Sequence, residues 1–468
     1  MNGLVKNIIF KNISYAVMAN GINLLISIAS AFIIPKLFGV AEYSYWQLYL
    51  FYTTYIGFFH FGWADGLYLR EGGKQYDELD KEDMAAQFRM YCLLETVVAF
   101  LIVLIALSFI QDKNRQFVMI CTAGCLLFYQ PTTFLQYILQ TTGRIKDYAK
   151  CAVRERLIYA AIVVLLLVIG VRNYWPLLLA DLFSKSILIF SMVFLCRDIV
   201  FRKVNDMVKY ISEAYENIRI GSRLMFANIA GILITGIVKF SIEYNWGIET
   251  FGKTSLTMTA SNMVLIFISA ISIVMYPMLK NISKEQLISV YYRLRDGLLI
   301  FTLGMLLCYY PLSKLLSIWL PQYADSLKYM GLLFPICVFE SKTTMLTNTY
   351  FKAIREETAM MQVNWISVIF TFLFTAVTAF VYKNLTVTML GLTVVLGFKS
   401  SLAEYVLGRY IDIKVKTDIA IEWCIIIVFC IMSWKFSGWR GECGYLAVYI
   451  IYLIYRSDKK KKRGLREG

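Results

Sequence analysis

The chain has 468 residues, of which 59% are hydrophobic and only 17% charged, and its formal net charge is +15. A soluble chain of this length needs more polar surface to cover its core, so the composition excludes a soluble globular fold. The basic residues gather in short clusters between apolar stretches, which is typical of membrane proteins and argues against nucleic acid as a partner. The sequence therefore predicts one integral membrane domain.

Apolar stretches long enough to cross roughly 30 Å of hydrocarbon recur from end to end and predict about fourteen transmembrane helices. The first half of the chain gives 13–36, 44–67, 88–110, 116–141, 154–171 and 174–196. The second half gives 222–244, 255–279, 296–320, 328–351, 359–382, 385–408, 418–436 and 440–456. The loops between these ranges are short, and the longest are the charged stretches 68–87 and 197–221.

The distribution of Lys and Arg between alternate sides tests this map. One side, which includes the run Lys459–Lys462 after the last helix, holds roughly three times as many basic residues as the other. A missed or an extra helix would reverse this bias from that point onward. The pattern therefore predicts that both termini are cytoplasmic. The outer, less basic side is expected to hold, among others, Lys314, Lys328, Lys435 and Arg440.

A weak internal repeat divides the helices. Gly39–Leu48 joins the first and second predicted helices, and the similar stretch Gly247–Leu256 joins the seventh and eighth. Pro131 and Pro335 take matching places in the fourth and tenth helices, where a missing backbone N–H kinks a membrane helix. An even number of helices separates the partners, so both copies insert in the same orientation. Two parallel six-helix lobes and two additional helices with a basic tail are expected at 1–210, 211–410 and 411–468.

Short motifs at the helix ends carry a family resemblance. They are Lys11-Asn-Ile-Ser14, Pro35-Lys-Leu-Phe-Gly39 with the stretch to Tyr45, Gly62–Arg70, Gly247–Thr254 and Tyr276-Pro277. In these motifs, in helix count and in loop lengths the chain resembles the polysaccharide flippases. These are the oligosaccharide-lipid exporters of the MOP superfamily, which also contains the MATE drug exporters and the murein lipid flippases.

The resemblance implies an all-α, MATE-like fold with two lobes around a central cavity and two further C-terminal helices. It implies alternating access that carries an undecaprenyl-pyrophosphate-linked oligosaccharide from the inner to the outer leaflet of a bacterial cell membrane, for cell-surface polysaccharide biosynthesis. Membrane lipids and other polysaccharide-assembly proteins are the implied partners. A MATE-type drug exporter and a peptidoglycan-precursor flippase stay open as alternatives within the superfamily.

Ionisable residues in the middle of predicted helices are costly in a membrane and usually face the bundle interior or water. Lys342 and Lys399 are the preferred cavity candidates, because no neighbour on the same helix accounts for them. Asp181 and Lys185 are four residues apart, so they share a helical face and can pair with each other. Glu340 lies two residues from Lys342, so the two point in different directions and at least one needs a partner on another helix.

A cationic cavity suits a pyrophosphate, which forms charge-assisted hydrogen bonds with basic side chains. We therefore hypothesise that cations in the membrane bind the substrate headgroup, the candidates being Lys185, Lys342, Lys399 and Arg70. Coupling to an ion, or gating, is assigned to the acidic candidates Asp65, Asp181 and Glu340.

The competing interpretation is a membrane enzyme, such as a polysaccharide polymerase, ligase or acyltransferase. Those reactions need placed acid–base groups or a large external loop. The single histidine, His60, lies among aromatic residues, where packing is favoured over a proton relay. The cysteines show no CxxC pair, and no phosphate-cradling glycine loop is found, so neither a metal nor a cofactor is expected. The sequence favours a transporter without catalytic residues.

Overall fold

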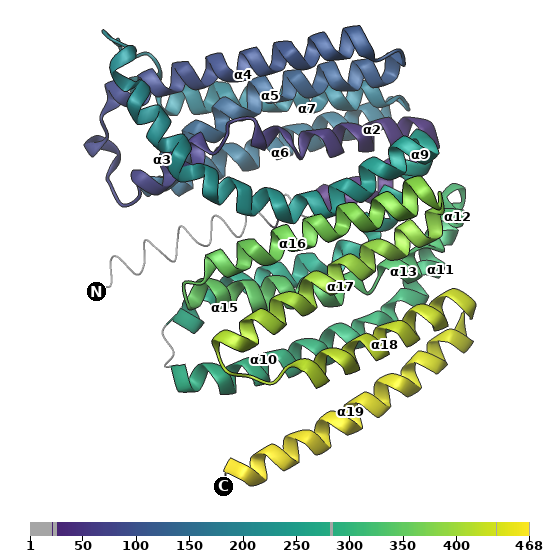
Figure 1. Cartoon of the computed structure of the whole chain (residues 1–468). Helices are drawn as coiled ribbons and strands as arrows, with labels where there is room; N and C mark the ends of the chain where they lie inside the picture. The colour runs from purple at the N-terminus through teal and green to yellow at the C-terminus, as the bar shows by residue number, and fades with distance from the viewer. Residues whose placement is uncertain (1–20, 22–25, 281–283, 437, 468) are drawn as a thin grey trace. The chain divides into compact units, whose positions relative to one another are not determined.

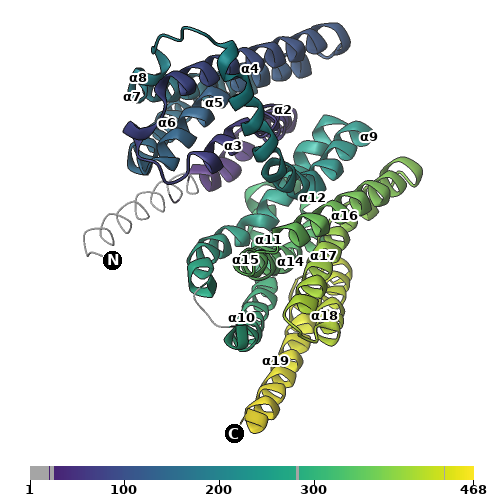
Figure 2. The same cartoon turned by 60° about the vertical axis from the view of Figure 1, so that its left-hand side comes forward.

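The computed structural model describes residue 21 and residues 26–280, 284–436 and 438–467, and Figures 1 and 2 show it from two directions. Regular structure in these ranges is helical throughout, with no strand. Eight of the described helical segments are long and apolar enough to cross a membrane. The predicted all-α membrane fold is confirmed. Half of the first predicted helix and the motif Lys11–Ser14 lie outside the described residues, and the described part contains the helix Ile26–Leu37.

The described chain forms two compact units that divide between Ile229 and Ala230, here called the N-terminal and C-terminal units. The predicted boundary after residue 210 coincides with the start of the long helical run α9, whereas the units divide inside that run. The C-terminal unit includes the two helices expected to follow the second lobe. The relation of the two lobes as repeats stays a prediction.

Helices of the N-terminal unit lie beside one another, with α5 in contact with α2, α4, α6 and α7 (Figure 1). The elements are α2 Val40–Thr53, η1 Ile56–Phe58, α3 Trp63–Arg70, η2 Tyr76–Glu78, α4 Lys81–Phe109, α5 Lys113–Thr141, α6 Ile145–Val168, α7 Tyr174–Leu195, α8 Arg197–Val200, η3 Val208–Tyr210 and the first part of α9 Ile211–Lys280. Their apolar faces enclose a core that includes Trp63, Phe88, Tyr91 and Phe134. Pro131 lies within α5, which continues past it.

The second predicted membrane helix, 44–67, is broken in the middle, so the expectation of one continuous helix is wrong there. Gly62, in the left-handed region with φ 85°, directly precedes α3. Side chains satisfy part of the freed backbone. Nδ1 of His60 accepts a hydrogen bond of 3.0 Å from the Gly62 N–H, and Nε2 of Gln130 donates one of 2.7 Å to the carbonyl of Ile56. Broken helices occur in membranes where such partners are supplied.

After this break, α3 crosses the start of α9 at backbone contact. A Cβ atom built on Gly66 would lie 1.8 Å from the carbonyl oxygen of Asn217. A Cβ atom on Gly221 would lie 1.9 Å from the carbonyl oxygen of Gly62. Small residues allow such close crossings of membrane helices. These three glycines therefore fix how near the two helices approach.

In the described residues the C-terminal unit contains the rest of α9 and fourteen further helical elements. They are α10 Lys284–Met305, η4 Leu306–Cys308, α11 Tyr309–Trp319, η5 Pro321–Tyr323, α12 Ala324–Leu327, α13 Met330–Leu333, α14 Ile336–Ser341, η6 Lys342–Thr347, α15 Asn348–Ala353, α16 Glu357–Thr375, η7 Ala376–Val381, α17 Leu385–Tyr410, α18 Lys416–Lys435 and α19 Trp439–Glu467. The elements η6 and η7 are π-helical. Helix α17 packs against α13, α14 and α16, and α19 packs against α10 and α18.

Two predicted interruptions occur in the C-terminal unit. Gly247 adopts φ 80° and ψ 178°, which breaks the helical path of α9 between the seventh and eighth predicted helices. Pro335 separates α13 from α14, as expected for a residue that cannot donate to the preceding turn. The tenth predicted helix is therefore several short helical pieces, with the π-helical turn η6 directly after α14.

Candidate functional site

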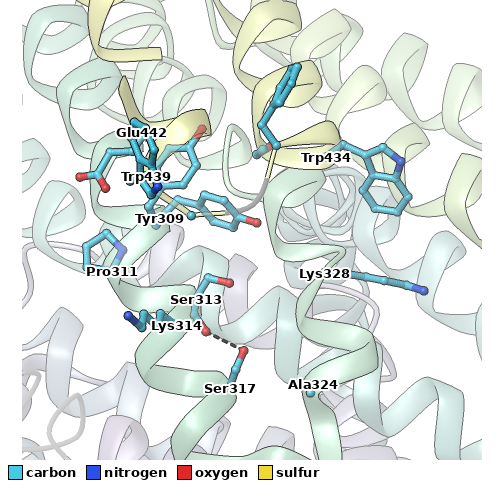
Figure 3. Close-up of a pocket in the computed structure, with 14 residues that line it drawn as sticks. Tyr309, Pro311, Ser313, Lys314, Ser317, Ala324, Lys328, Trp434, Trp439 and Glu442 are labelled. Atoms are coloured by element: carbon cyan, nitrogen blue, oxygen red, sulfur yellow. Dashed lines mark hydrogen bonds between the residues drawn. The ribbon is translucent and has the colours of Figure 1, made fainter. Parts of the chain in front are cut away.

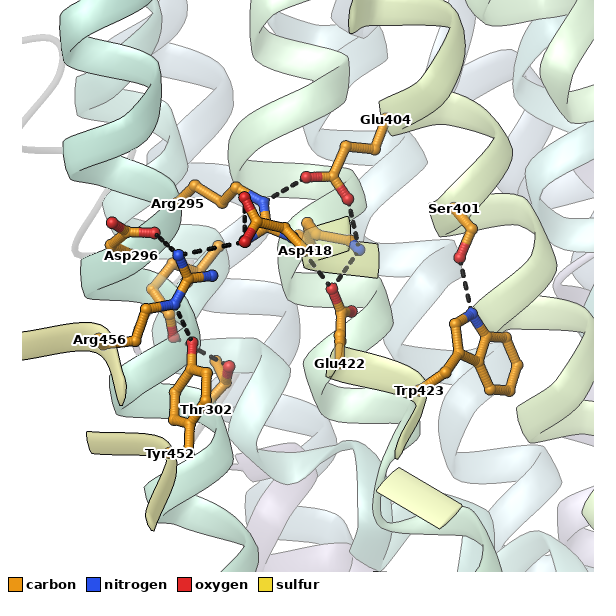
Figure 4. A network of polar contacts seen from close by, with 12 residues as sticks. Arg295, Asp296, Thr302, Ser401, Glu404, Asp418, Glu422, Trp423, Tyr452 and Arg456 are labelled. Atoms are coloured by element: carbon orange, nitrogen blue, oxygen red, sulfur yellow. Dashed lines mark hydrogen bonds and ion pairs between the residues drawn. The ribbon is translucent and has the colours of Figure 1, made fainter. Parts of the chain in front are cut away.

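Charged side chains are buried deep in the C-terminal unit, and Figure 4 shows their arrangement. They come from α10, η6, α17, α18 and α19. We call them the buried charge network, whose members are Arg295, Lys342, Glu404, Asp418, Glu422 and Arg456. Taking ions out of water is costly unless they are paired and hydrogen-bonded. Each buried charge of the network therefore needs a partner of opposite charge.

Lys342 lies at the centre of the network and is fully buried. Its Nζ atom donates a hydrogen bond of 2.9 Å to Glu404 and one of 2.6 Å to Glu422. Glu404 also pairs with Arg295 and accepts a hydrogen bond of 2.7 Å from the Tyr291 hydroxyl. Lys342 and Arg295 thus share the carboxylate of Glu404, and Glu422 supplies the second negative charge.

The rim of the network binds the last helix to the rest of the unit. Arg295 lies 3.6 Å from Glu422 and 4.0 Å from Asp418, both on α18. Arg456 of α19 lies 3.4 Å from Asp418 and 2.9 Å from Asp296 of α10. The two C-terminal helices are therefore tied to α10, η6 and α17 by ion pairs in addition to apolar packing.

A second ion pair lies near this network but is more accessible. Nζ of Lys399 on α17 donates a hydrogen bond of 3.0 Å to Glu340 on α14. The side chains are 7% and 21% exposed, respectively, whereas Lys342 is inaccessible. Both cations that lack a partner on their own helix therefore find one on another helix. Glu340 and Lys342 diverge, as their spacing indicated.

The N-terminal unit has its own buried polar cluster where α2, α6 and α7 meet. Asp181 and Lys185 form the predicted ion pair on α7. The Tyr49 hydroxyl of α2 donates a hydrogen bond of 2.6 Å to Asp181. Ser184 donates one of 3.0 Å to Glu155 of α6. Asp181 therefore has one cation and one tyrosine donor, whereas Glu404 in the other unit has two cations beside its tyrosine.

Arg70 and Asp65 lie on α3 but have different surroundings. Arg70 binds Glu213 at 2.6 Å and donates a hydrogen bond of 3.0 Å to the side-chain oxygen of Asn217, both on α9. Asp65 is buried, 3.9 Å from His60, beside a cavity of about 160 Å³ at the helix break. Arg70 therefore holds two helices of the N-terminal unit together, while Asp65 faces a small polar cavity.

The sequence did not single out several members of the buried charge network, among them Arg295, Asp418 and Glu422. Arg295 lies close to a predicted helix end, where a loop residue is the ordinary interpretation. Asp418 and Glu422, however, are four residues apart in an otherwise apolar helix. Such a pair on one helical face needs a shared cation, and this spacing was the available signal.

The described residues contain no group of three or more His, Cys, Asp or Glu side chains placed to hold a metal ion. His60 is buried, accepts a backbone hydrogen bond and packs against Tyr91, with 6.2 Å between ring centroids and 29° between ring planes. This supports the packing role expected for that histidine. The polar groups brought together by the fold are ion pairs and hydrogen-bonded clusters inside helical bundles.

Comparisons with known proteins identify the fold. No protein-family model and no curated protein matches the sequence. An inward-facing multidrug resistance MATE family transporter of the MOP superfamily matches with a TM-score of 0.58 and 13% identity over 84% of this chain and 95% of that chain. The lipid II flippase MurJ in an inward closed conformation matches with a TM-score of 0.59 and 12% identity over 97% of this chain and 99% of that chain.

An outward-facing MATE family transporter also matches, with a TM-score of 0.54 and 11% identity over 89% of this chain and 96% of that chain. The chain therefore has the fold of the MOP-superfamily transporters. At these identities the likeness establishes the fold, and the function has to be argued from the residues of this chain.

Proposed function

We propose that this protein is a flippase that carries an undecaprenyl-pyrophosphate-linked oligosaccharide from the inner to the outer leaflet of a bacterial cell membrane. It acts by alternating access and serves the synthesis of cell-surface polysaccharide. The fold supports transport, since both kinds of neighbour bear the names of transporters or flippases. The lipid-linked saccharide is the substrate class that the sequence resemblance implies.

The observation that carries this proposal is the extent of the match to a lipid flippase. The part of this chain that MurJ leaves uncovered is 3%, or about 14 residues, which is fewer than the 20 residues of α18. The likeness therefore reaches into the two C-terminal helices beyond the predicted lobes. The MATE transporter leaves 16% of this chain uncovered. A twelve-helix drug exporter lacks an equivalent of such a helix pair.

The structure refines which cations are proposed to meet the substrate. Lys342 is enclosed by two carboxylates and inaccessible, so we now propose that it holds helices together and does not contact substrate. Lys185, Lys399 and Arg70 each have one carboxylate partner and side chains that are 12%, 7% and 29% exposed. We propose that these three exchange a carboxylate for pyrophosphate oxygens during transport.

The partner carboxylates are then released when the substrate binds. Asp181 and Glu340 would lose their cations at that moment, and each becomes a site for a proton or another cation. This is how ion coupling or gating enters the proposal. Asp65, at its separate polar cavity, is the third gating candidate.

The alternatives within the superfamily predict different substrates for the same fold. A MATE-type drug exporter would move a cationic drug, and a peptidoglycan-precursor flippase would move lipid II. Each cation proposed for the substrate is paired with a carboxylate, so charge does not separate these alternatives. The flippase proposal is favoured over drug export by the C-terminal helix pair that the match to MurJ covers, while the choice between lipid-linked sugars depends on resemblance.

Reconstituted vesicles test the proposal. Purified protein is inserted into liposomes that carry a fluorescent lipid-linked oligosaccharide in one leaflet, and a membrane-impermeant quencher reports its transfer. Transfer of this probe, with slower transfer of lipid II and no drug-dependent ethidium export, is the expected result. Export of ethidium alone would contradict the proposal, and conversion of the saccharide without transfer would favour a membrane enzyme.

A further inference from the structure

A second kind of charged surface lies at the other end of the C-terminal helices. A cavity of about 790 Å³ opens where α11, α12, the end of α18 and the start of α19 meet. We call it the aromatic pocket, because Figure 3 shows Tyr309 and Trp439 on one side of it and Trp434 on another. Its volume lies within the range of ordinary ligand pockets, about 300–1,000 Å³.

The basic residues of this pocket differ from those of the buried charge network. Lys314 and Lys328 line the cavity, and among the described residues no carboxylate lies within 4.0 Å of either ammonium group. Each cation of the buried network, in contrast, has a carboxylate within that distance. The pocket therefore presents two cations without a carboxylate partner within that distance, together with one carboxylate, Glu442, in its lining.

A buried hydroxyl group points to the same conclusion independently. Tyr310 lines the pocket and is 7% exposed, yet its hydroxyl has no hydrogen-bond partner among the described residues. Buried polar groups are normally hydrogen-bonded, because an unmade bond costs about 1–3 kcal/mol. An unpartnered donor beside a cavity is explained by a ligand or water that occupies the cavity.

The aromatic wall is arranged before any ligand arrives. Two lining residues pack on Tyr329, which does not itself line the pocket: the Trp434 ring lies 5.9 Å from the Tyr329 ring at 32°, and the Lys328 ammonium group lies 5.3 Å from it. Trp434 and Trp439 remain 42% and 70% exposed. Rigid aromatic side chains offer a large contact area at low entropic cost, and the apolar face of a sugar ring packs on such surfaces.

We infer that the aromatic pocket binds the saccharide headgroup of the lipid-linked substrate, with Lys314 and Lys328 contacting its phosphate or acidic groups. This inference rests on the proposed function and adds a subsite to it. The charge pattern predicts that this end of the helices lies on the outer side of the membrane. The pocket thus binds the saccharide after it has crossed the membrane and before the lipid dissociates from the protein.

An ordinary membrane-surface belt is the competing explanation, because Trp, Tyr and Lys also gather at membrane interfaces. That belt would contact phospholipid headgroups and would not select a saccharide. The two ligands share a phosphate, so the test has to identify the lipid that occupies the pocket.

Photo-crosslinking in cells that make the protein separates the two. A p-benzoylphenylalanine residue replaces Ala324, which lines the pocket, or Phe372, an exposed residue of α16 that does not. Mass spectrometry then identifies the lipids attached after irradiation. We expect saccharide-bearing lipid at position 324 and phospholipid alone at position 372. Phospholipid alone at both positions would overturn the inference.

The lysines are tested against a matched control in the same experiment. Replacing both Lys314 and Lys328 by Gln is expected to lower the yield of saccharide-bearing adduct about tenfold, which corresponds to ~1.4 kcal/mol. Lys435→Gln removes an exposed charge near the same helix end but outside the pocket lining, and the yield should not change. Equal losses in both variants would contradict the inference.

The crosslinking experiment tests the pocket, and the vesicle assay tests the flippase proposal, so the two can be contradicted independently. Lipid transfer in vesicles without a saccharide adduct at position 324 would overturn the pocket and leave the flippase proposal standing. A saccharide adduct without transfer would overturn the flippase proposal and leave a saccharide-binding pocket.

Discussion

The two units hold their helices together by different means. In the N-terminal unit, α3 and α9 meet at backbone contact through Gly62, Gly66 and Gly221. In the C-terminal unit, the closest polar ties are ions, with Lys342 enclosed by Glu404 and its second partner on α18. The helix crossing requires residues without a side chain, whereas the ion network requires equal numbers of buried positive and negative charges. The two units should therefore respond to different substitutions.

The largest effect is expected when one member of the ion network is removed. Lys342→Met leaves two buried carboxylates with Arg295 as their remaining close cation, and loss of one partner from a buried pair costs about 3–5 kcal/mol. Thermal unfolding of the purified protein in detergent measures the loss. If the midpoint did not move, the network would not stabilise the unit.

Restoring the balance sharpens this test. The double variant Lys342→Met, Glu422→Gln removes one charge of each sign and keeps the Arg295–Glu404 pair. It should recover much of the stability lost in the single variant, because replacing a buried pair is less costly than breaking it. Losses that simply add would show that charge balance is not the cause.

The glycine crossing is tested by a single methyl group. Gly66→Ala places a Cβ atom where the Asn217 carbonyl lies, so the helices have to separate, at a cost of about 1–3 kcal/mol or more. Gly231→Ala is the matched control, because nothing lies within 4 Å of a Cβ atom built there. The unfolding midpoint should fall in the first variant and stay or rise in the second. Equal midpoints would contradict the close contact.

A third effect compares the ion pairs of the two units directly. Lys185→Met deprives one carboxylate of its cation, whereas Lys342→Met deprives two, and Asp181 keeps the hydrogen bond from Tyr49, so the loss should be smaller, about 1–3 kcal/mol. The same variant should slow lipid transfer in vesicles if Lys185 contacts the pyrophosphate. Normal transfer by a folded variant would remove Lys185 from the proposed substrate site.

The smallest effect is expected at the end of the N-terminal helices, in a charged cluster outside the membrane segments. Asp198 is partly buried, which raises its pKa, but hydrogen bonds from Lys81 and Tyr76, both 2.8 Å, outweigh burial and hold the pKa below its usual range. A lowered pKa means that this stabilisation is present above about pH 4 and is lost as the pH falls through the folded-state pKa.

Asp198→Asn should therefore lower the unfolding midpoint at neutral pH by a small amount, within about 1 kcal/mol because solvent screens the pair. The difference from the unchanged protein should shrink as the pH is lowered towards the folded-state pKa. A difference that grows in acid would contradict the assigned direction. Comparing unfolding curves at several pH values decides the matter.

Helix existence was predictable from the sequence, because long apolar stretches bounded by charges leave few alternatives in a membrane. The break at Gly62 was not, since the residues that compensate it, such as Gln130, come from another helix far along the chain. The break between α13 and α14 was predictable from Pro335 alone, because proline has no backbone N–H to donate to the preceding turn. The sequence thus predicts breaks that one residue causes, but it does not predict breaks that depend on hydrogen bonds from a distant helix.

The candidate site was predictable in part for the same reason. The Asp181–Lys185 pair follows from helical spacing and is present. The partners of Lys342 and Lys399 depend on which helices the fold brings together, and no spacing on one helix reveals them. The aromatic pocket was missed because its residues come from chain segments more than 100 residues apart, such as Lys314 and Trp439.

The corner at Gly247 has a consequence for heredity. Its φ of 80° and ψ of 178° belong to a region that is essentially reserved for glycine. Nothing lies within 4 Å of a Cβ atom built there, so space alone would admit alanine. Every single-nucleotide change in a glycine codon that alters the amino acid adds a side chain. In cells that depend on this protein, the codon should therefore tolerate only synonymous change, and that invariance would record a backbone angle rather than a contact.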